Sequence, residues 1–151
     1  MANTQAMCTS FKAEILSGIH ALGTTVIRAG TGADTIKAAL YLASATVNAA
    51  TTAYSATGEV SGTGYTAGGI TATNATAPTS SGTTAYWTPS ASFTYTTVTL
   101  TTSFDCVLVY NSTQSNKAIS VHTFGSQTIT AGTFTLTMPT SDATNALIRI
   151  A

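Results

Sequence analysis

Charged residues are scarce in this sequence of 151 residues, and their scarcity excludes several classes of function. Lys and Arg number 5 and Asp and Glu number 5, so charged residues make up 7% of the chain, where soluble domains typically have about a quarter. The absence of a basic stripe argues against binding to nucleic acid. Because the net charge is zero, little repulsion would keep free monomers apart, and the composition favours a subunit of an assembly.

Long hydrophobic runs are also absent. The mean hydropathy is +0.26, but no apolar run approaches the roughly 18 residues that a membrane helix needs, so no membrane association is expected. The first residues, "MANTQAMCTSFKAEIL", lack the basic and apolar regions of a signal peptide, and we expect synthesis in a reducing cytoplasm.

Cysteine and histidine are too few and too scattered for a metal site. Cys8 and Cys106 show no C-x-x-C pattern, and His20 and His122 stand at unrelated spacings, so no zinc site is expected. The sequence predicts two free structural thiols and no cofactor.

Only the N-terminal part of the chain has a helical pattern. Residues 1–9 carry neither charge nor periodicity and are predicted to form an extended arm. Residues 10–23 are predicted to form a short helix, with Ser10 as its N-cap and Gly23 as its C-cap. The apolar residues at helical spacing are Phe11, Ile15, Ile19 and Leu22.

From Asp34 onward the hydrophobic period changes to two. The clearest example is residues 133–138, where Phe134, Leu136 and Met138 alternate with threonines, as in a half-buried strand. About eight such runs are separated by turn residues, with no helix between them. The sequence therefore predicts a mainly β fold, in which residues 10–151 form a single antiparallel β-sandwich or jelly-roll domain with a short leading helix.

The segment "GEVSGTGYTAGG" (residues 58–69) contains Gly62, Gly64 and Ala67 in the spacing G-x-G-x-x-A of a dinucleotide-binding motif. That motif works only between a strand and a helix, with an acidic residue about 20 positions further on. Here the following "GGITATNAT" is typical of a strand and the acidic residue is missing. We therefore predict a structural loop in which Gly62, Gly64, Gly68 and Gly69 adopt left-handed conformations, with positive φ.

Two other groups of residues could carry chemistry. Asp105 and His122 could pair across a hairpin in a hydrolase, but we favour a hydrogen-bonded or edge-facing Asp105. No two carboxylates are close in sequence, and we predict that the protein is not an enzyme. The aromatic residues Tyr86, Trp87 and Tyr95 could line a sugar site, but such residues more often fill a core or a subunit interface.

The chain resembles small virion proteins of tailed bacteriophages. The resemblance runs nearly end to end and rests on "CTSFKAEILSGIHAL", "DTIKAALYLASA", "TTAYSATGEVSGTGYTAGG", "VLVYNSTQSNKAI" and "TITAGTFTLTMPTSDATNALIRIA". Proteins of this kind are similar to capsid decoration (cement) proteins, which are β-rich, often trimeric, and clamp neighbouring capsomers from outside the head.

The resemblance implies a binding role on the virion exterior, with the major capsid protein and further copies of this chain, in a homotrimer, as partners. Synthesis would then take place in the host bacterial cytoplasm. The alternative is a tail- or fibre-associated structural protein or a host-glycan adhesin. The residues expected at the capsid or subunit interface are Asn3, Thr4, Gln5, Met7, Phe11, Ile15, Tyr86 and Trp87.

Overall fold

The computed structural model describes residues 3–16, 18–20, 22, 33–73 and 76–151. Within them the chain is almost entirely strands and loops. In chain order the elements are β1 (Ala6–Met7), α1 (Thr9–Leu16), β2 (Ile36–Leu42), β3 (Ile70–Thr71), β4 (Thr79–Ser81), β5 (Thr84–Trp87), β6 (Phe93–Asn111), β7 (Lys117–Leu136) and β8 (Ile148–Ile150).

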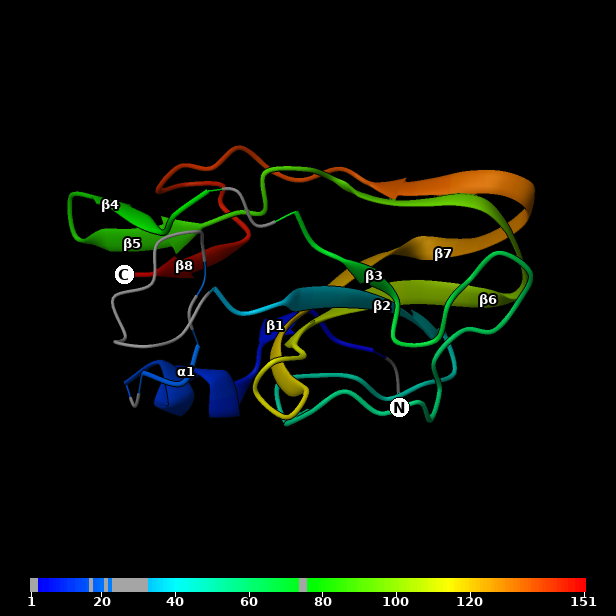
Figure 1. Cartoon of the computed structure of the whole chain (residues 1–151), viewed down its shortest axis with the longest axis horizontal. Helices are drawn as coiled ribbons and strands as arrows, with labels where there is room; N and C mark the ends of the chain where they lie inside the picture. The colour runs from blue at the N-terminus through cyan, green and yellow to red at the C-terminus, as the bar shows by residue number, and fades with distance from the viewer. Residues whose placement is uncertain (1–2, 17, 21, 23–32, 74–75) are drawn as a thin grey trace.

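The strands form two antiparallel sheets. One has five strands in the order β1–β7–β6–β2–β3, and the other has three in the order β4–β5–β8. The predicted class, mainly β with antiparallel pairing and a short helix near the N-terminus, is therefore confirmed, while the jelly-roll alternative is not. Figure 1 shows the smaller sheet at one end of the molecule, beyond the larger one.

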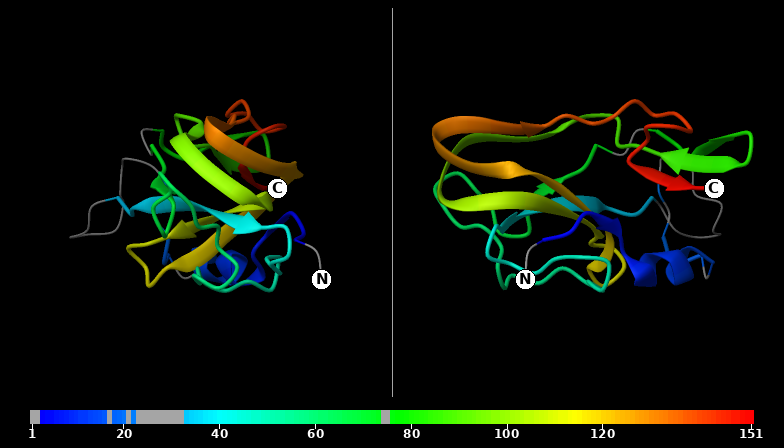
Figure 2. Two further views of the ribbon diagram at one scale, coloured as in Figure 1. Left: turned by 90° about the vertical axis from the view of Figure 1, so that its right-hand side faces the viewer. Right: turned by 180° about the vertical axis from the view of Figure 1, so that it is seen from behind.

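The hairpin of β6 and β7 organises the fold. Its strands have 19 and 20 residues, several times the usual length of about five or six. The register shifts between Tyr95 and Val98 and again before Leu100, and Thr97 and Ala131 have positive φ at these shifts. Such bulges bend a strand and increase its twist. The hairpin consequently curves at one end of the molecule and runs back above the sheet (Figures 1 and 2).

The core lies between the two halves of this folded hairpin, which gives sandwich-like packing. The Tyr95 hydroxyl, from the outer half, donates a hydrogen bond of 2.8 Å to the carbonyl of Ala38 in β2. The rings of Phe104 and Phe134 meet edge to face, with centroids 5.2 Å apart. Outer-half side chains alternate between core and solvent, and the predicted half-buried strand over residues 133–138 is confirmed as far as Leu136, where β7 ends.

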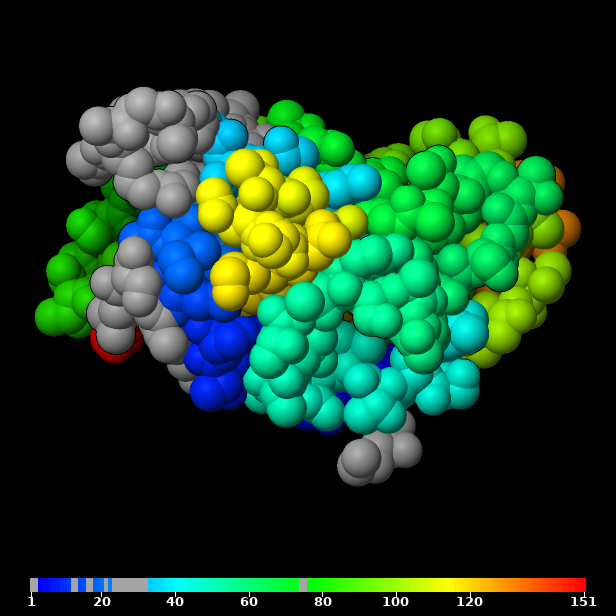
Figure 3. All heavy atoms as spheres, turned by 60° about the horizontal axis from the view of Figure 1, so that its bottom comes forward, coloured from blue at the N-terminus to red at the C-terminus, as the bar shows by residue number. Residues whose placement is uncertain are grey.

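The opposite face of the five-stranded sheet is also covered. Helix α1 packs there through Phe11, which is fully buried, and the loop of residues 43–60 lies beside it. The Tyr54 ring stacks on Tyr110 at 4.8 Å, and the Tyr41 hydroxyl donates to the Ser55 carbonyl at 2.5 Å. Figure 3 shows this face closed by the N-terminal segment, the loop and the β6–β7 turn. The sheet is therefore the middle layer of the molecule.

The predicted boundaries of the helix are wrong. Helix α1 begins at Thr9, so Ser10 lies in its first turn rather than at the N-cap. The Ser10 hydroxyl oxygen is buried, and no described residue forms a hydrogen bond with it. The chain turns away at Gly18, which has φ +67°, with hydrogen bonds from Gly18 N to Ile15 O and from Ile19 N to Glu14 O. These two bonds form a Schellman motif, which ends the helix at Leu16. The predicted cap Gly23 lies outside the described residues.

The N-terminal segment is extended, as expected, but it is not a free arm. Its residues Ala6 and Met7 form β1, which pairs with Val121 and Ser120 of β7. The Asn3 amide nitrogen donates to the Leu42 carbonyl at 3.1 Å and to the Asp105 carboxylate at 2.5 Å, and the Asn3 amide oxygen accepts a hydrogen bond from Val47 N at 2.9 Å. The segment therefore belongs to the sheet of its own chain.

Deletion of residues 2–7 should destabilise the protein, because it removes β1 and the hydrogen bonds of Asn3. At about 1 kcal/mol for each net hydrogen bond, the three bonds of the Asn3 side chain alone contribute about 3 kcal/mol. Urea unfolding followed by circular dichroism measures this loss, with Thr4→Ala, at an exposed position, as the control. Equal stability of the deletion variant and the full chain would show that the segment is not docked in solution.

The glycine-rich loop has the structural role predicted for it. Gly64, Gly68 and Gly69 have φ of +78°, +86° and +69°, as predicted, and the segment leads into β3 rather than into a helix. The prediction of positive φ is wrong for Gly62, where glycine is needed because a β-carbon would lie 2.1 Å from the carbonyl oxygen of Thr99. A β-carbon on Gly64 would lie 2.3 Å from the carbonyl oxygen of Thr97, so the loop approaches β6 more closely than any other residue type permits.

Gly64→Val should lower the free energy of unfolding by about 1–3 kcal/mol, because valine is strained at positive φ and would displace the Thr97 carbonyl. Gly125→Val is the matched control, since a β-carbon there meets nothing within 4 Å.

Thermal melts of the wild-type protein with NAD or ATP test the nucleotide-binding interpretation of this loop. We expect no shift of the melting temperature, and a saturable rise would restore that interpretation.

Candidate functional site

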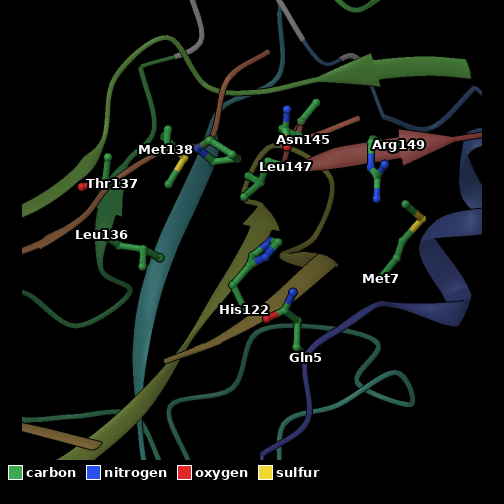
Figure 4. A pocket seen from close by; sticks show the side chains of 11 residues that line it. Gln5, Met7, His122, Leu136, Thr137, Met138, Asn145, Leu147 and Arg149 are labelled. Atoms are coloured by element: carbon green, nitrogen blue, oxygen red, sulfur yellow. The ribbon is translucent and has the colours of Figure 1, made fainter. Parts of the chain in front are cut away.

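A pocket of about 470 Å³ lies between the β1 edge of the five-stranded sheet and the C-terminal part of the chain (Figure 4). Gln5, Met7 and His122 line it from the sheet. Residues 136–139, at and after the end of β7, line the other side together with residues 145–147, which lead into β8, and Arg149 of β8. Its volume falls in the range of about 300–1,000 Å³ that is usual for ligand sites.

His122 is the one titratable imidazole in the lining of this pocket, and β7 fixes its direction. Residues two apart in a strand share a face, so Ser120 lies beside it, with its hydroxyl oxygen 2.8 Å from His122 Nε2. Burial lowers the pKa of His122 to about 4, because a charged ring would lose hydration there. The ring is therefore neutral at pH 7.

The other polar groups of the pocket are an amide and a guanidinium. Gln5 is exposed, and its amide oxygen accepts only a long contact of 3.5 Å from the Thr123 hydroxyl. Among the described residues that line the pocket, Arg149 is the one with a formal charge. Its guanidinium donates to the carbonyl of Ala143 at 3.4 Å, near the upper limit for a hydrogen bond.

The favoured interpretation of Asp105, a hydrogen-bonded carboxylate, is confirmed, and the alternative pairing with His122 is not formed. Asp105 accepts its hydrogen bond from Asn3, and the β6–β7 ladder places Val107, not Asp105, opposite His122. Ser120 is 1% exposed, so a substrate cannot reach its hydroxyl in this conformation. The serine therefore orients the imidazole, and this pair of side chains is suited to binding a ligand rather than to attacking a substrate.

The eight residues expected at an interface fall into two groups. Phe11 and Trp87 are 0% and 1% exposed, so their side chains belong to the core of this chain and are not available to a partner. A role in contacts stays a prediction for the other six. Of these, Thr4 and Gln5 are exposed, while Asn3, Met7, Ile15 and Tyr86 are half-buried.

Trp87 is also unavailable for the sugar site considered from the sequence. Its indole nitrogen donates a hydrogen bond of 3.0 Å to the carbonyl of Thr76, and its ring faces the core. Tyr95 is likewise buried and bonded to Ala38. Tyr86 alone of the three reaches the surface, so these aromatic residues form no platform on which a sugar ring could stack.

A buried polar network joins the helix region to the β6–β7 turn, and sequence reasoning missed it. His20 Nε2 lies 2.7 Å from the Glu14 carboxylate, which also accepts a hydrogen bond of 2.6 Å from Lys117. His20 Nδ1 lies 3.1 Å from the amide nitrogen of Asn111, which donates to Asp34 at 2.8 Å. His20 follows Glu14 by six residues, and two side chains at this spacing do not meet on a helix. Here they do meet, because helix α1 ends between them.

The second missed centre is Glu59, in the glycine-rich loop. Its carboxylate accepts hydrogen bonds from the hydroxyls of Tyr54 and Tyr65 at 2.6 and 2.7 Å and from Gly68 N at 2.8 Å. Burial, followed by the hydrogen bond to this carboxylate, raises the pKa of both tyrosines above its usual range. The loop is thus held together by one acidic side chain, which explains an isolated Glu among glycines.

The thiols fit the prediction made for them. Cys8 and Cys106 are both free and buried. Burial, with a smaller effect of Glu14 and Asp105 respectively, raises the pKa of Cys8 to about 11 and that of Cys106 to about 12. Both thiols are therefore protonated at neutral pH and poorly nucleophilic.

Comparison with protein-family models, with curated proteins and with solved structures gives no match to this chain. In the part of the chain that the structure describes, no cluster of three or more His, Cys, Asp or Glu side chains could hold a metal ion. No helix among those residues is long and apolar enough to cross a membrane.

Acid should destabilise the fold through its histidines. Their pKa values are lowered by burial, so the unfolded chain takes up protons first, and stability falls as the pH drops below the ordinary value of 6.5. For His122, whose folded pKa is about 4, this loss reaches about 2 kcal/mol between pH 7 and pH 5. Urea unfolding at both pH values measures it.

His122→Gln is the matching variant, because glutamine keeps hydrogen-bonding capacity but does not titrate in this range. Its stability should depend less on pH than that of the wild-type protein, and the remaining dependence should come largely from His20. Identical pH dependence in the two proteins would contradict the assignment to His122.

Proposed function

We propose that this protein is a structural component of a bacteriophage virion, a decoration (cement) protein. In this proposal it binds the outside of the head as a homotrimer and clamps neighbouring subunits of the major capsid protein. The proposal rests on the end-to-end resemblance described above and on one feature of the molecule, the almost complete internal use of its acidic groups.

All five acidic residues of the chain accept hydrogen bonds from groups of the same chain. The surface therefore consists mainly of hydroxyl, amide and methyl groups. Burial of such a surface against a partner avoids the large cost of desolvating unpaired charges, and neighbouring copies on a lattice do not repel one another. The acceptor and donor pairs are Glu14 with Lys117, Asp34 with Asn111, Glu59 with Tyr54 and Tyr65, Asp105 with Asn3, and Asp142 with Asn145.

The outer half of the β6–β7 hairpin offers a rigid surface for this contact. Thr94 and Thr135 are directly paired there, with hydroxyl oxygens 3.3 Å apart. Their neighbours Tyr95 and Phe134 point inward and anchor the strands to the core. We assign capsid binding to this threonine face, which consists of the exposed residues Thr94, Thr96, Thr133, Thr135 and Thr137. Many weak contacts of this kind add up when an oligomer engages a repeating lattice.

The docked N-terminal segment changes one part of the expectation. Residues 3–9 are bonded within their own chain, so the threonine face rather than an arm carries the lattice contact in this proposal. The tail-associated and adhesin alternatives stay open, but the glycan-binding form of the adhesin depended on Trp87, which is buried.

Electron cryo-microscopy of the virion tests the location. We expect trimeric density over the capsid lattice, and density confined to the tail would refute a role in decoration.

Thr135→Lys should weaken binding to heads that lack this protein by at least about tenfold, because the lysine charge must be desolvated at the contact.

Thr57→Lys, at an exposed position in another loop, is the matched control and should bind like the wild-type protein. If both variants bind as the wild-type protein does, the threonine face is not the contact surface, although a role in decoration could still hold.

A further inference from the structure

We propose that the pocket around His122 is a binding site for a small carboxylate that carries an apolar group. This inference goes beyond the proposed role on the virion and depends only on the pocket. Two kinds of molecule present such a carboxylate next to an apolar group: a free organic acid, and the C-terminal end of a peptide whose last side chain is apolar.

The pocket can hold the apolar group because one part of its wall is aliphatic. Met7, Leu136, Met138 and Leu147 line it, and all four are only partly buried while they pack against the core. Their exposed area is therefore available to a ligand, and methionine adapts its shape readily to what it contacts. An apolar ligand group that covers these side chains removes their surface from water.

The charge of the pocket selects an anion. Arg149 is formally charged and no carboxylate lines the pocket. Asp142 lies close enough to interact electrostatically with Arg149: hydrogen bonds from Asn145 and Thr144, and to a smaller extent the guanidinium, lower the pKa of its carboxyl. This carboxylate accepts its hydrogen bonds from the backbone N–H groups of Thr144 and Asn145 and from the Asn145 amide, and none comes from Arg149. Apart from the long contact with Ala143, the guanidinium makes no hydrogen bond to the described residues. A planar guanidinium binds a carboxylate through two parallel hydrogen bonds.

Neutral hydrogen-bonding groups complete the site. His122 Nε2 is bonded to Ser120, and no hydrogen bond from the described residues reaches Nδ1. When the serine donates to Nε2, the proton of the neutral ring lies on Nδ1, which can then donate to a ligand oxygen. The Gln5 side chain lies beside His122 in the pocket wall (Figure 4), and its amide N–H can donate a hydrogen bond to the ligand. One cation with neutral donors suits a monocarboxylate better than a multiply charged phosphate.

The geometry of β8 accommodates the peptide source. Strand β8 pairs with β5 along one edge, and within the described residues no strand pairs with its other edge. Since Arg149 is the middle residue of β8, a short extended peptide could pair with this edge and place its terminal carboxylate at the guanidinium.

The test is a titration of the isolated ¹⁵N-labelled protein, followed by two-dimensional NMR, with N-acetylleucine and with N-acetyl-Ala-Ala-Leu. We expect saturable shifts at His122, Leu147 and Arg149 with at least one of them. Much tighter binding of the peptide would identify a peptide C-terminus as the source, and similar binding of both would identify a free acid. N-acetylleucinamide, which lacks the carboxylate, should bind at least about tenfold more weakly.

Arg149→Gln should weaken the binding of N-acetylleucine about tenfold or more, and Arg149→Lys should weaken it less. Lys37→Gln removes a positive charge outside the pocket and should leave binding unchanged. The proposal is overturned if neither acid gives saturable shifts at millimolar concentrations, if the amide binds as well as the acid, or if folded Arg149→Gln binds like the wild-type protein. None of these outcomes bears on head decoration, which is measured separately on particles.

Discussion

The bend of the β6–β7 hairpin is the constraint on which the rest of the molecule depends. In a straight hairpin of this length, the outer half would extend past the rest of the sheet with nothing to pack against. The rings of Tyr95 and Phe134 would then be exposed to solvent. The bulges fold the outer half back, and these rings then pack against Phe104 and β2. The hairpin thus supplies both layers of the core from one pair of strands, and the pocket lies where these layers meet the C-terminal segment.

Periodicity made the strands predictable, because a half-buried strand must alternate apolar and polar residues whatever its partners are. The same argument could not give the bend. Thr97 and Ala131 have positive φ although neither is a glycine, and nothing in their identity signals a bulge. The N-terminal strand was missed for a related reason, since two residues, Ala6 and Met7, are too few to show any period.

The candidate site was less predictable than the fold because it gathers residues from distant parts of the chain. Ser120 and His122 are two apart in a strand, and that spacing alone could have indicated their contact. Gln5 and Arg149 could not have been connected to them, because their meeting depends on how the sheet edge and β8 are placed. The spacing of six residues between Glu14 and His20 indicates no contact on a helix, and this rule does not apply here because the helix ends at Leu16.

The short outer strands of the larger sheet have a consequence for how this chain avoids uncontrolled self-association. Both edges of the sheet, β1 and β3, are only two residues long, and neither carries a charge. Proteins commonly protect sheet edges with charged side chains, because an unpaired backbone edge can recruit a strand from another copy. This chain has few charges to use in that way. The 20-residue strand β7 is paired with β1 only at Ser120 and Val121, so most of its outer edge is not covered by β1. There the register shifts and the bend of the hairpin take the place of charge, because a bulged and twisted edge is a poor template for a flat strand from another copy.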